Sequence, residues 1–189
     1  MKPDRLNAFT DGVIAVIITI MVLELKLPAE PSWQAVRAVL PLLGIYALSF
    51  VNIGIYWNNH HHMMQSVRRV DGRVLWANLL LLFWLSLFPL LIRWVGEAGV
   101  STMPVAAFGV DLVLASFAYL LLERALIACE GERSTVAKAV GSRTKEWLSF
   151  GLYVIGFGAA FAEPWLSLAL YVAVAIIWFV PDRRFEQQA

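Results

Sequence analysis

Long apolar runs separated by short polar breaks dominate the chain. A membrane-spanning helix needs about 20 mostly apolar residues, and six runs approach or exceed that length: 6–27, 35–62, 74–95, 103–128, 146–162 and 165–181. Gly96 and Gly99 mark the turn after the third run, and Glu163 and Pro164 make a tight turn between the last two. The pattern predicts an all-α integral membrane protein with six transmembrane helices, in which residues 1–189 form a single domain.

The composition agrees with a membrane protein. Of the 189 residues, 60% are hydrophobic and only 15% are charged, whereas a soluble domain is about half apolar and a quarter charged. Tryptophans lie near several ends of the predicted spans, where indole rings favour the headgroup region. The net charge is only +1 and no long basic run occurs, so we expect membrane lipid as a partner and no nucleic acid.

The distribution of Lys and Arg predicts the orientation, because cytoplasmic loops carry an excess of both. If the N-terminus is cytoplasmic, twelve of the fifteen fall on the inner side. These are Lys2, Arg5, Arg68, Arg69, Arg73, Arg124, Arg133, Lys138, Arg143, Lys145, Arg183 and Arg184. We therefore expect a multi-pass protein of the inner (plasma) membrane with both termini in the cytoplasm.

Several polar side chains fall at one depth inside the predicted membrane. At about 1.5 Å per residue, Asp11 of the first span, His60 and His61 of the second and Asn78 of the third all lie near the cytoplasmic side. Ionisable residues in a membrane are costly and often functional. We interpret the group as a hydrogen-bonded network that joins three helices, with a proton relay through Asp11 and a histidine as the alternative. Asp111, in the outer half of the fourth span, is interpreted as a structural carboxyl, either hydrogen-bonded or protonated.

Three consecutive histidines, residues 60–62, raise the question of a metal site. Neighbouring residues on a helix point about 100° apart, so one helix cannot direct all three at a single ion. Cys129 is the single cysteine and has no partner at a metal-binding spacing. We expect no metal site and no cofactor.

The first span carries an apolar stripe. At 100° per residue, Val16, Ile20 and Leu23 lie within about 60° of one another, and Thr19 lies at the edge of this stripe. Almost every face of so apolar a helix is apolar. The pattern alone therefore favours contact with lipid or with another helix over a pore.

A specific motif opens the first span. Arg5, Phe9, Thr10 and Asp11 form the pattern R-x-x-x-F-T-D, followed by GVIAVIITIMVLELKLP. This opening resembles the R-x-x-x-F-S-D motif of bacterial members of the transmembrane protein 175 family, potassium channels that are also found in lysosomes. Thr10 replaces the serine of the motif and keeps its hydroxyl. Further matching positions are Tyr46, Ser49, Phe50, Trp57, His60 and His61 in the second span, and Trp76, Asn78, Leu79 and Pro89 in the third. In the second half the likeness is limited to hydropathy.

The resemblance implies a homotetramer around a central pore that is lined by the first helix. The pore would conduct potassium ions with weak to moderate selectivity, and a hydrophobic constriction would replace a carbonyl filter. The positions implied for the constriction are Val16, Ile20 and Leu23, with either Val16 or Ile20 as the narrowest layer. Thr19 would offer an oxygen to the ion.

The resemblance also implies that the motif anchors the pore helix. The residues implied for this network are Arg5, Phe9, Thr10, Asp11, Trp57, His60, His61 and Asn78. By holding the cytoplasmic end of the first helix, they would set the distance of the apolar stripe from the pore axis.

Two alternative functions are a secondary transporter and an intramembrane enzyme. A proton-coupled secondary transporter would use Asp11 and a histidine of the second span, but such proteins usually show internal repeats and broken helices. The glycines of the fifth span, Gly151, Gly156 and Gly158, are more simply explained as close helix contacts. The sequence has no HExxH, no G-x-S-x-G and no spaced pair of acids, so we expect that the protein is not an enzyme.

Overall fold

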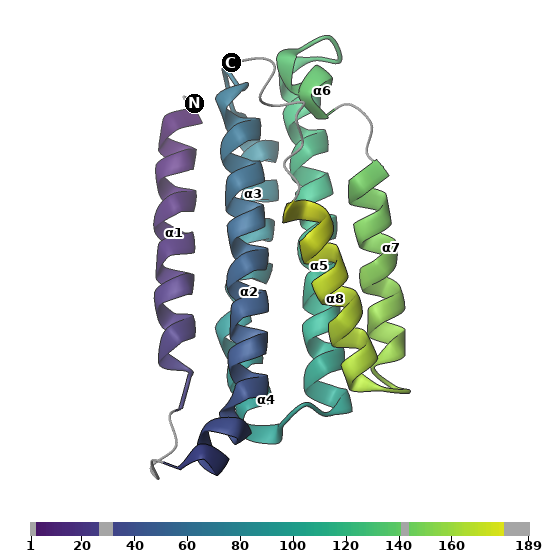
Figure 1. Ribbon diagram of the computed structural model, residues 1–189. Coiled ribbons are helices and arrows are strands. Elements are labelled where there is room, and N and C mark those ends of the chain that lie inside the picture. Colours follow the sequence, from purple (N-terminus) through teal and green to yellow (C-terminus); the bar gives the residue numbers. More distant parts are fainter. Residues whose placement is uncertain (1–2, 27–31, 141–143, 180–189) are drawn as a thin grey trace.

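The computed structural model describes residues 3–26, 32–140 and 144–179 (Figure 1). These residues form eight α-helices and no strand. The helices are α1 (Pro3–Leu23), α2 (Trp33–Gln65), α3 (Gly72–Leu85), α4 (Phe88–Ala98), α5 (Thr102–Glu130), α6 (Thr135–Val140), α7 (Thr144–Ala159) and α8 (Pro164–Phe179). The long helices lie roughly side by side and alternate in direction, so that the start of α1, the end of α2 and the end of α5 share one end of the bundle (Figure 1).

Each of the six predicted runs falls on helix. The third run covers two helices, because the backbone breaks at Ser86 and Leu87 between α3 and α4. By length and composition, four segments can cross a membrane: α1, α2, α5 and the segment Gly72–Ala98. Residue 27, which ends the first predicted span, and residues 180–181, which end the last, lie outside the described residues.

The last two helices are shorter. α7 and α8 have 16 residues each, which gives about 24 Å at 1.5 Å per residue, compared with a hydrocarbon core of about 30 Å. The crossing of the membrane by these two helices stays a prediction. The orientation does too, and four of the charges on which it depends lie outside the described residues: Lys2, Arg143, Arg183 and Arg184.

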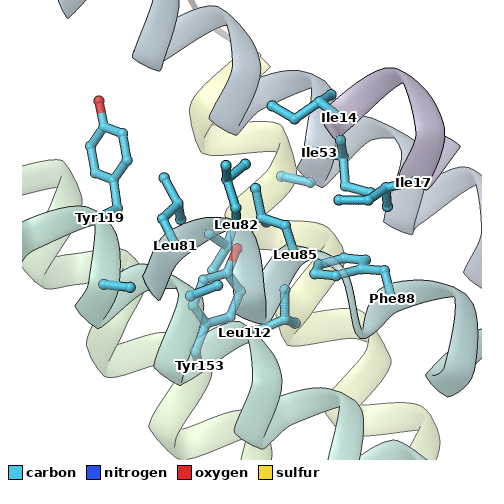
Figure 2. Packing of buried hydrophobic residues seen from close by; sticks show 14 of the residues in the cluster. Ile14, Ile17, Ile53, Leu81, Leu82, Leu85, Phe88, Leu112, Tyr119 and Tyr153 are labelled. Atoms are coloured by element: carbon cyan, nitrogen blue, oxygen red, sulfur yellow. The ribbon is translucent and has the colours of Figure 1, made fainter. Parts of the chain in front are cut away.

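α5 lies at the centre of the bundle and packs against α3, α4, α7 and α8. α1 packs against α2, α3 and α4 and stands at one side of the bundle (Figure 1). Buried apolar side chains fill the space between the helices, among them Ile14 and Ile17 of α1, Ile53 of α2 and Leu85 of α3 (Figure 2). One side of the first helix is thus built into the core.

A tyrosine and two glycines bring α5, α7 and α8 close together. Tyr171 of α8 is fully buried, and its ring lies where a side chain at Gly109 of α5 or at Gly156 of α7 would have to go. Ser167 of α8 also donates a hydrogen bond to the backbone oxygen of Gly156. Gly156 is therefore a packing contact, as predicted. A methyl group at Gly151 or Gly158 would meet no atom within 4 Å in the described structure, so these two glycines are not such contacts in a single chain.

The loop between α2 and α3 is fixed to the end of α5. Glu130 Oε1 accepts hydrogen bonds from the backbone N–H groups of Arg68 and Arg69, at 3.1 and 2.8 Å. The Arg69 guanidinium donates to the backbone oxygen of Cys129, with Nη2 at 2.8 Å. These contacts hold the neighbouring ends of α2 and α3 in place.

Candidate functional site

A buried polar network joins α1, α2 and α3 near the start of α1. Asn78 Nδ2 donates to Thr10 Oγ1 at 2.9 Å, and Asn78 Oδ1 lies 2.9 Å from His60 Nε2. An amide oxygen can only accept, so His60 donates this bond. Thr10, His60 and Asn78 are 1%, 2% and 0% exposed. Because water does not reach these groups, each depends on the others for its hydrogen bonds.

A second set of contacts lies beside this network. Trp57 Nε1 of α2 donates to Asp11 Oδ1 of α1 at 2.8 Å. The Trp57 ring stacks on His61, with the ring centroids 5.8 Å apart and the planes 25° from parallel. The side-chain amide of Gln65 lies 3.0 Å from His61 Nε2. Asp11 and Trp57 are exposed in the single chain, so these contacts form the outer side of the connection between α1 and α2.

The residues predicted for the network are distributed over these two sets. Thr10, Asn78 and His60 meet in the buried set, whereas Asp11 and His61 are connected through Trp57. Reasoning from depth alone did not pair Asp11 with Trp57. The signal for it is helical spacing, because Trp57 lies one turn before His60 and His61 on α2.

Arg5 and Phe9 are both exposed in the single chain. The three histidines do not converge. His60 is buried against Asn78, His61 stacks on Trp57, and the His62 ring meets His61 edge-on at 6.1 Å.

α1 has two contrasting faces. One face is buried and consists of Leu6, Thr10, Ile14, Ile17 and Met21. The other face carries the apolar stripe Val16, Ile20 and Leu23, whose side chains are 55%, 42% and 78% exposed. From Val16 to Leu23 the stripe covers about 10 Å along the helix. No other part of the described chain covers these three side chains fully.

Thr19 lies beside the stripe and is also exposed. Its hydroxyl donates a hydrogen bond to the backbone oxygen of Val16 at 2.8 Å. The proton of the hydroxyl is therefore used within the helix, and the lone pairs of Oγ1 are available to a group outside it.

A groove runs along the exposed face of α1, next to the break between α3 and α4. It has a volume of about 710 Å³. α1 contributes Phe9, Gly12, Val16 and Ile20 to its lining, and the other side is formed by Ser86, Pro89, Leu90 and Arg93. Within the described residues the stripe therefore borders open space.

The far end of α1 is connected to α4 by charges. Lys26 Nζ and Arg93 Nε both contact Glu97 Oε1, at 3.3 and 3.1 Å. All three side chains are half exposed or more, so water screens these ion pairs and they contribute little to stability. This end of the helix is held more weakly than the end with the buried network.

Asp111 of α5 is 3% exposed. Within the described residues neither of its carboxyl oxygens has a hydrogen-bond partner. Of the two interpretations of Asp111, the hydrogen-bonded carboxyl is therefore not met and the protonated carboxyl stays a prediction. The residue contributes to neither of the networks at α1.

Comparison with known proteins identifies the family of the chain. The model of the family described as the endosomal/lysosomal potassium channel TMEM175 matches residues 5–89. A potassium channel from Chryseobacterium sp. (strain P1-3) is 48% identical over 187 residues, which cover 99% of this chain and 97% of the relative. The chain belongs to the TMEM175 family of potassium channels.

Two further similar proteins come from Chamaesiphon minutus. A potassium channel of strain ATCC 27169 / PCC 6605 is 30% identical over 187 residues, or 91% of each chain. The crystal structure of a lysosomal potassium-selective channel TMEM175 homolog from this organism superposes with a TM-score of 0.75 at 26% identity, and covers 94% of this chain and 96% of the other. The likeness thus extends over the second half of the chain, where the sequence indicated only similar hydropathy.

Membership of the TMEM175 family confirms the resemblance of the opening motif. The family is one of potassium channels and not of enzymes. With its apolar helices, the protein is a multi-pass membrane protein. Both polar networks and the apolar stripe fall within the residues that the family model matches.

Proposed function

We propose that the protein is a potassium channel whose pore is lined by α1 and constricted by Val16, Ile20 and Leu23. The observation that carries the proposal is the contrast between the faces of α1: one face is buried in the bundle, and a neighbouring face, about 100° around the helix, presents an uncovered apolar stripe. The buried polar network beside the stripe supports the proposal, because it gives this face a fixed direction.

The pore is formed by four copies of the chain. The sequence shows no internal repeat, and α1 stands at the side of the bundle instead of at the centre (Figure 1). A pore along α1 therefore requires several chains around one axis, and closed rotational symmetry is the usual arrangement of identical subunits. In a homotetramer each layer of the stripe becomes a ring of four side chains.

The rings control conduction by excluding water. A narrow passage lined with aliphatic side chains loses its water and stops ions, and a small tilt or rotation of the helices readmits both. Either Val16, with the shorter side chain, or Ile20, with the less exposed one, forms the narrowest layer. The network of Thr10, Asn78 and His60 fixes the rotation of α1 and so the direction of the stripe.

Selectivity is weak to moderate in this mechanism. Potassium holds its hydration shell less tightly than the smaller sodium ion, so it passes a dry constriction at lower cost. Thr19 Oγ1, whose lone pairs are available next to Val16, replaces part of the lost hydration. Membrane lipid surrounds the tetramer, potassium ions are the permeant species, and no cofactor takes part. The channel lies in the inner (plasma) membrane with both termini in the cytoplasm.

The test is a reversal potential. The purified protein is reconstituted in planar bilayers with potassium chloride on one side and sodium chloride on the other. We expect a current whose reversal potential shifts toward the equilibrium potential of potassium. A current that reverses at zero would contradict potassium selectivity. Proton-driven uptake that is lost in Asp11→Asn, with no conductance in either form, would replace the channel with the transporter.

A further inference from the structure

A small cavity lies between α2, α5, α7 and α8, and no residue of α1 lines it. Its unfilled space is about 30 Å³, and one water molecule needs about 10–15 Å³ of such space. The cavity therefore has room for about two molecules of the size of water, and a larger ligand does not fit.

Polar side chains from three helices line this cavity. Among them are Asn52 and Asn59 of α2, Ser116 and Tyr119 of α5, and Ser149 and Tyr153 of α7. Tyr119 and Tyr153 can be followed in Figure 2. An apolar guest such as an acyl chain would leave buried polar groups unpaired, at a cost in free energy. The lining therefore favours a polar guest.

Two oxygen atoms of the lining can accept further hydrogen bonds. Tyr153 of α7 donates its hydroxyl proton to Asn52 Oδ1 of α2 at 3.0 Å. An amide oxygen has two lone pairs, of which this bond uses one, and the phenolic oxygen keeps its own lone pairs because it acts here as the donor. A guest that donates hydrogen bonds therefore finds acceptors on both helices.

The lining also has hydroxyl protons to donate. Ser149 Oγ accepts a hydrogen bond from Trp178 Nε1 at 2.8 Å, which leaves the Ser149 proton for a further acceptor. Tyr119 is 7% exposed, and its hydroxyl donates to no other group within the described residues. Buried hydroxyl groups almost always have a partner, in the protein or in ordered water. The guest must therefore accept hydrogen bonds as well as donate them.

An ion fulfils only half of this requirement. A monovalent cation binds lone pairs alone, so the Tyr119 proton would stay unpaired, and an anion would face the oxygens of Asn52 and Tyr153. The carboxylate of Glu146 also lines the cavity, but it already interacts with another group. It is therefore not set aside as the counter-charge of a bound cation.

We propose that the cavity is a binding site for about two ordered water molecules, which join α2 to α5 and α7. The waters accept hydrogen bonds from Tyr119 and Ser149 and donate to Asn52 and Tyr153. Water bridges of this kind are nearly as favourable as direct hydrogen bonds. The helix that holds α1 through His60 is thus itself connected through water to the second half of the chain. Because no residue of α1 lines the site, the proposal does not depend on the proposed function.

A crystal structure of the full-length protein tests the identity of the guest. The crystals are grown with rubidium chloride in place of potassium chloride, and data are collected at the rubidium absorption edge. We expect separate density peaks in the cavity, within hydrogen-bond distance of Tyr119 and Asn52 and without anomalous signal. An anomalous peak would show that a monovalent cation occupies the site. That result, an empty cavity or the density of a detergent or lipid chain would each overturn the proposal.

NMR in detergent micelles tests the same site in solution, through nuclear Overhauser effects from water to the methyl groups of ¹³C-labelled leucine. Leu120 lines the cavity and is 5% exposed, so we expect an effect at its methyl groups. Leu112 of the same helix is 0% exposed and does not line the cavity. It is the matched control and should show no effect.

Two variants of Ser116 separate bound water from exchanging hydroxyl protons of the lining. Ser116→Val fills part of the cavity and should abolish the effect at Leu120, whereas Ser116→Ala leaves the space open and should keep it. An effect that is absent from the unmodified protein, or that persists unchanged in Ser116→Val, would overturn the proposal. If Ser116→Val does not fold, the crystal structure of the unmodified protein still decides.

Discussion

Asn78 uses one side-chain amide to hold three helices together. Its nitrogen bonds to Thr10 of α1 and its oxygen to His60 of α2, while the residue itself belongs to α3. All three residues are buried. Loss of one partner would therefore leave another polar group without a bond in a place that water does not reach, which costs more than the bond itself contributes.

Thr10 allows a clean test of this network. Thr10→Val removes the hydroxyl but keeps the shape, and leaves the Asn78 N–H unpaired. We expect a loss of about 1–3 kcal/mol in the free energy of unfolding, measured by denaturant titration in detergent. Thr10→Ser keeps the hydroxyl and should change the stability by far less. Equal stability of the two variants would show that the hydrogen bond to Asn78 contributes nothing.

The sequence predicted which residues belong to the polar network better than it predicted which of them form hydrogen bonds with one another. Depth along the spans placed Asp11, the histidines and Asn78 at one level, and the buried set does join Asn78 to His60. The partner of Asp11 depends on how α2 is rotated relative to α1, which depth does not specify. The lack of a hydrogen-bond partner for the Asp111 carboxyl within the described residues could not be predicted either, because it depends on which side chains of neighbouring helices face it.

At the scale of the helices, hydropathy located the apolar runs along the chain but not the helix breaks within them. Residues 74–95 remain apolar across the break at Ser86 and Leu87, so the run showed no boundary there. The available signal was Pro89 near the start of α4, because proline has no N–H for the preceding turn and favours the first turn of a new helix. α6 was missed for a different reason: it lies in the polar segment between the fourth and fifth predicted spans, where no apolar run indicates a helix.

α7 and α8 can pack closely because Gly156 has no side chain. Gly156→Ala would place a methyl group in the space that the Tyr171 ring occupies, and such overpacking costs about 1–3 kcal/mol. We expect Gly156→Ala to lower the midpoint of thermal unfolding. Gly158→Ala, on the same helix and with no atom within 4 Å, is the matched control and should leave the midpoint nearly unchanged. If both variants melt alike, Tyr171 does not limit the packing of these helices.

For the whole molecule, the decisive feature is that one chain leaves the stripe of α1 uncovered. The fold buries another face of this helix in its own core and anchors that face with a polar network. The stripe therefore points to something outside the chain, either lipid or the axis of an assembly. These two cases differ in what happens when the stripe becomes polar.

The most direct measurement is the single-channel conductance of two asparagine variants of α1 in planar bilayers. Ile20→Asn lies in the stripe. Val22→Asn is on the same helix, 47% exposed and about 160° from Ile20 around the helix axis. If Val16, Ile20 and Leu23 form the constriction, Ile20→Asn should wet it and raise the conductance, while Val22→Asn should behave as the unmodified channel does. An unchanged conductance in Ile20→Asn, or an equal rise in both variants, would contradict a pore lined by the stripe.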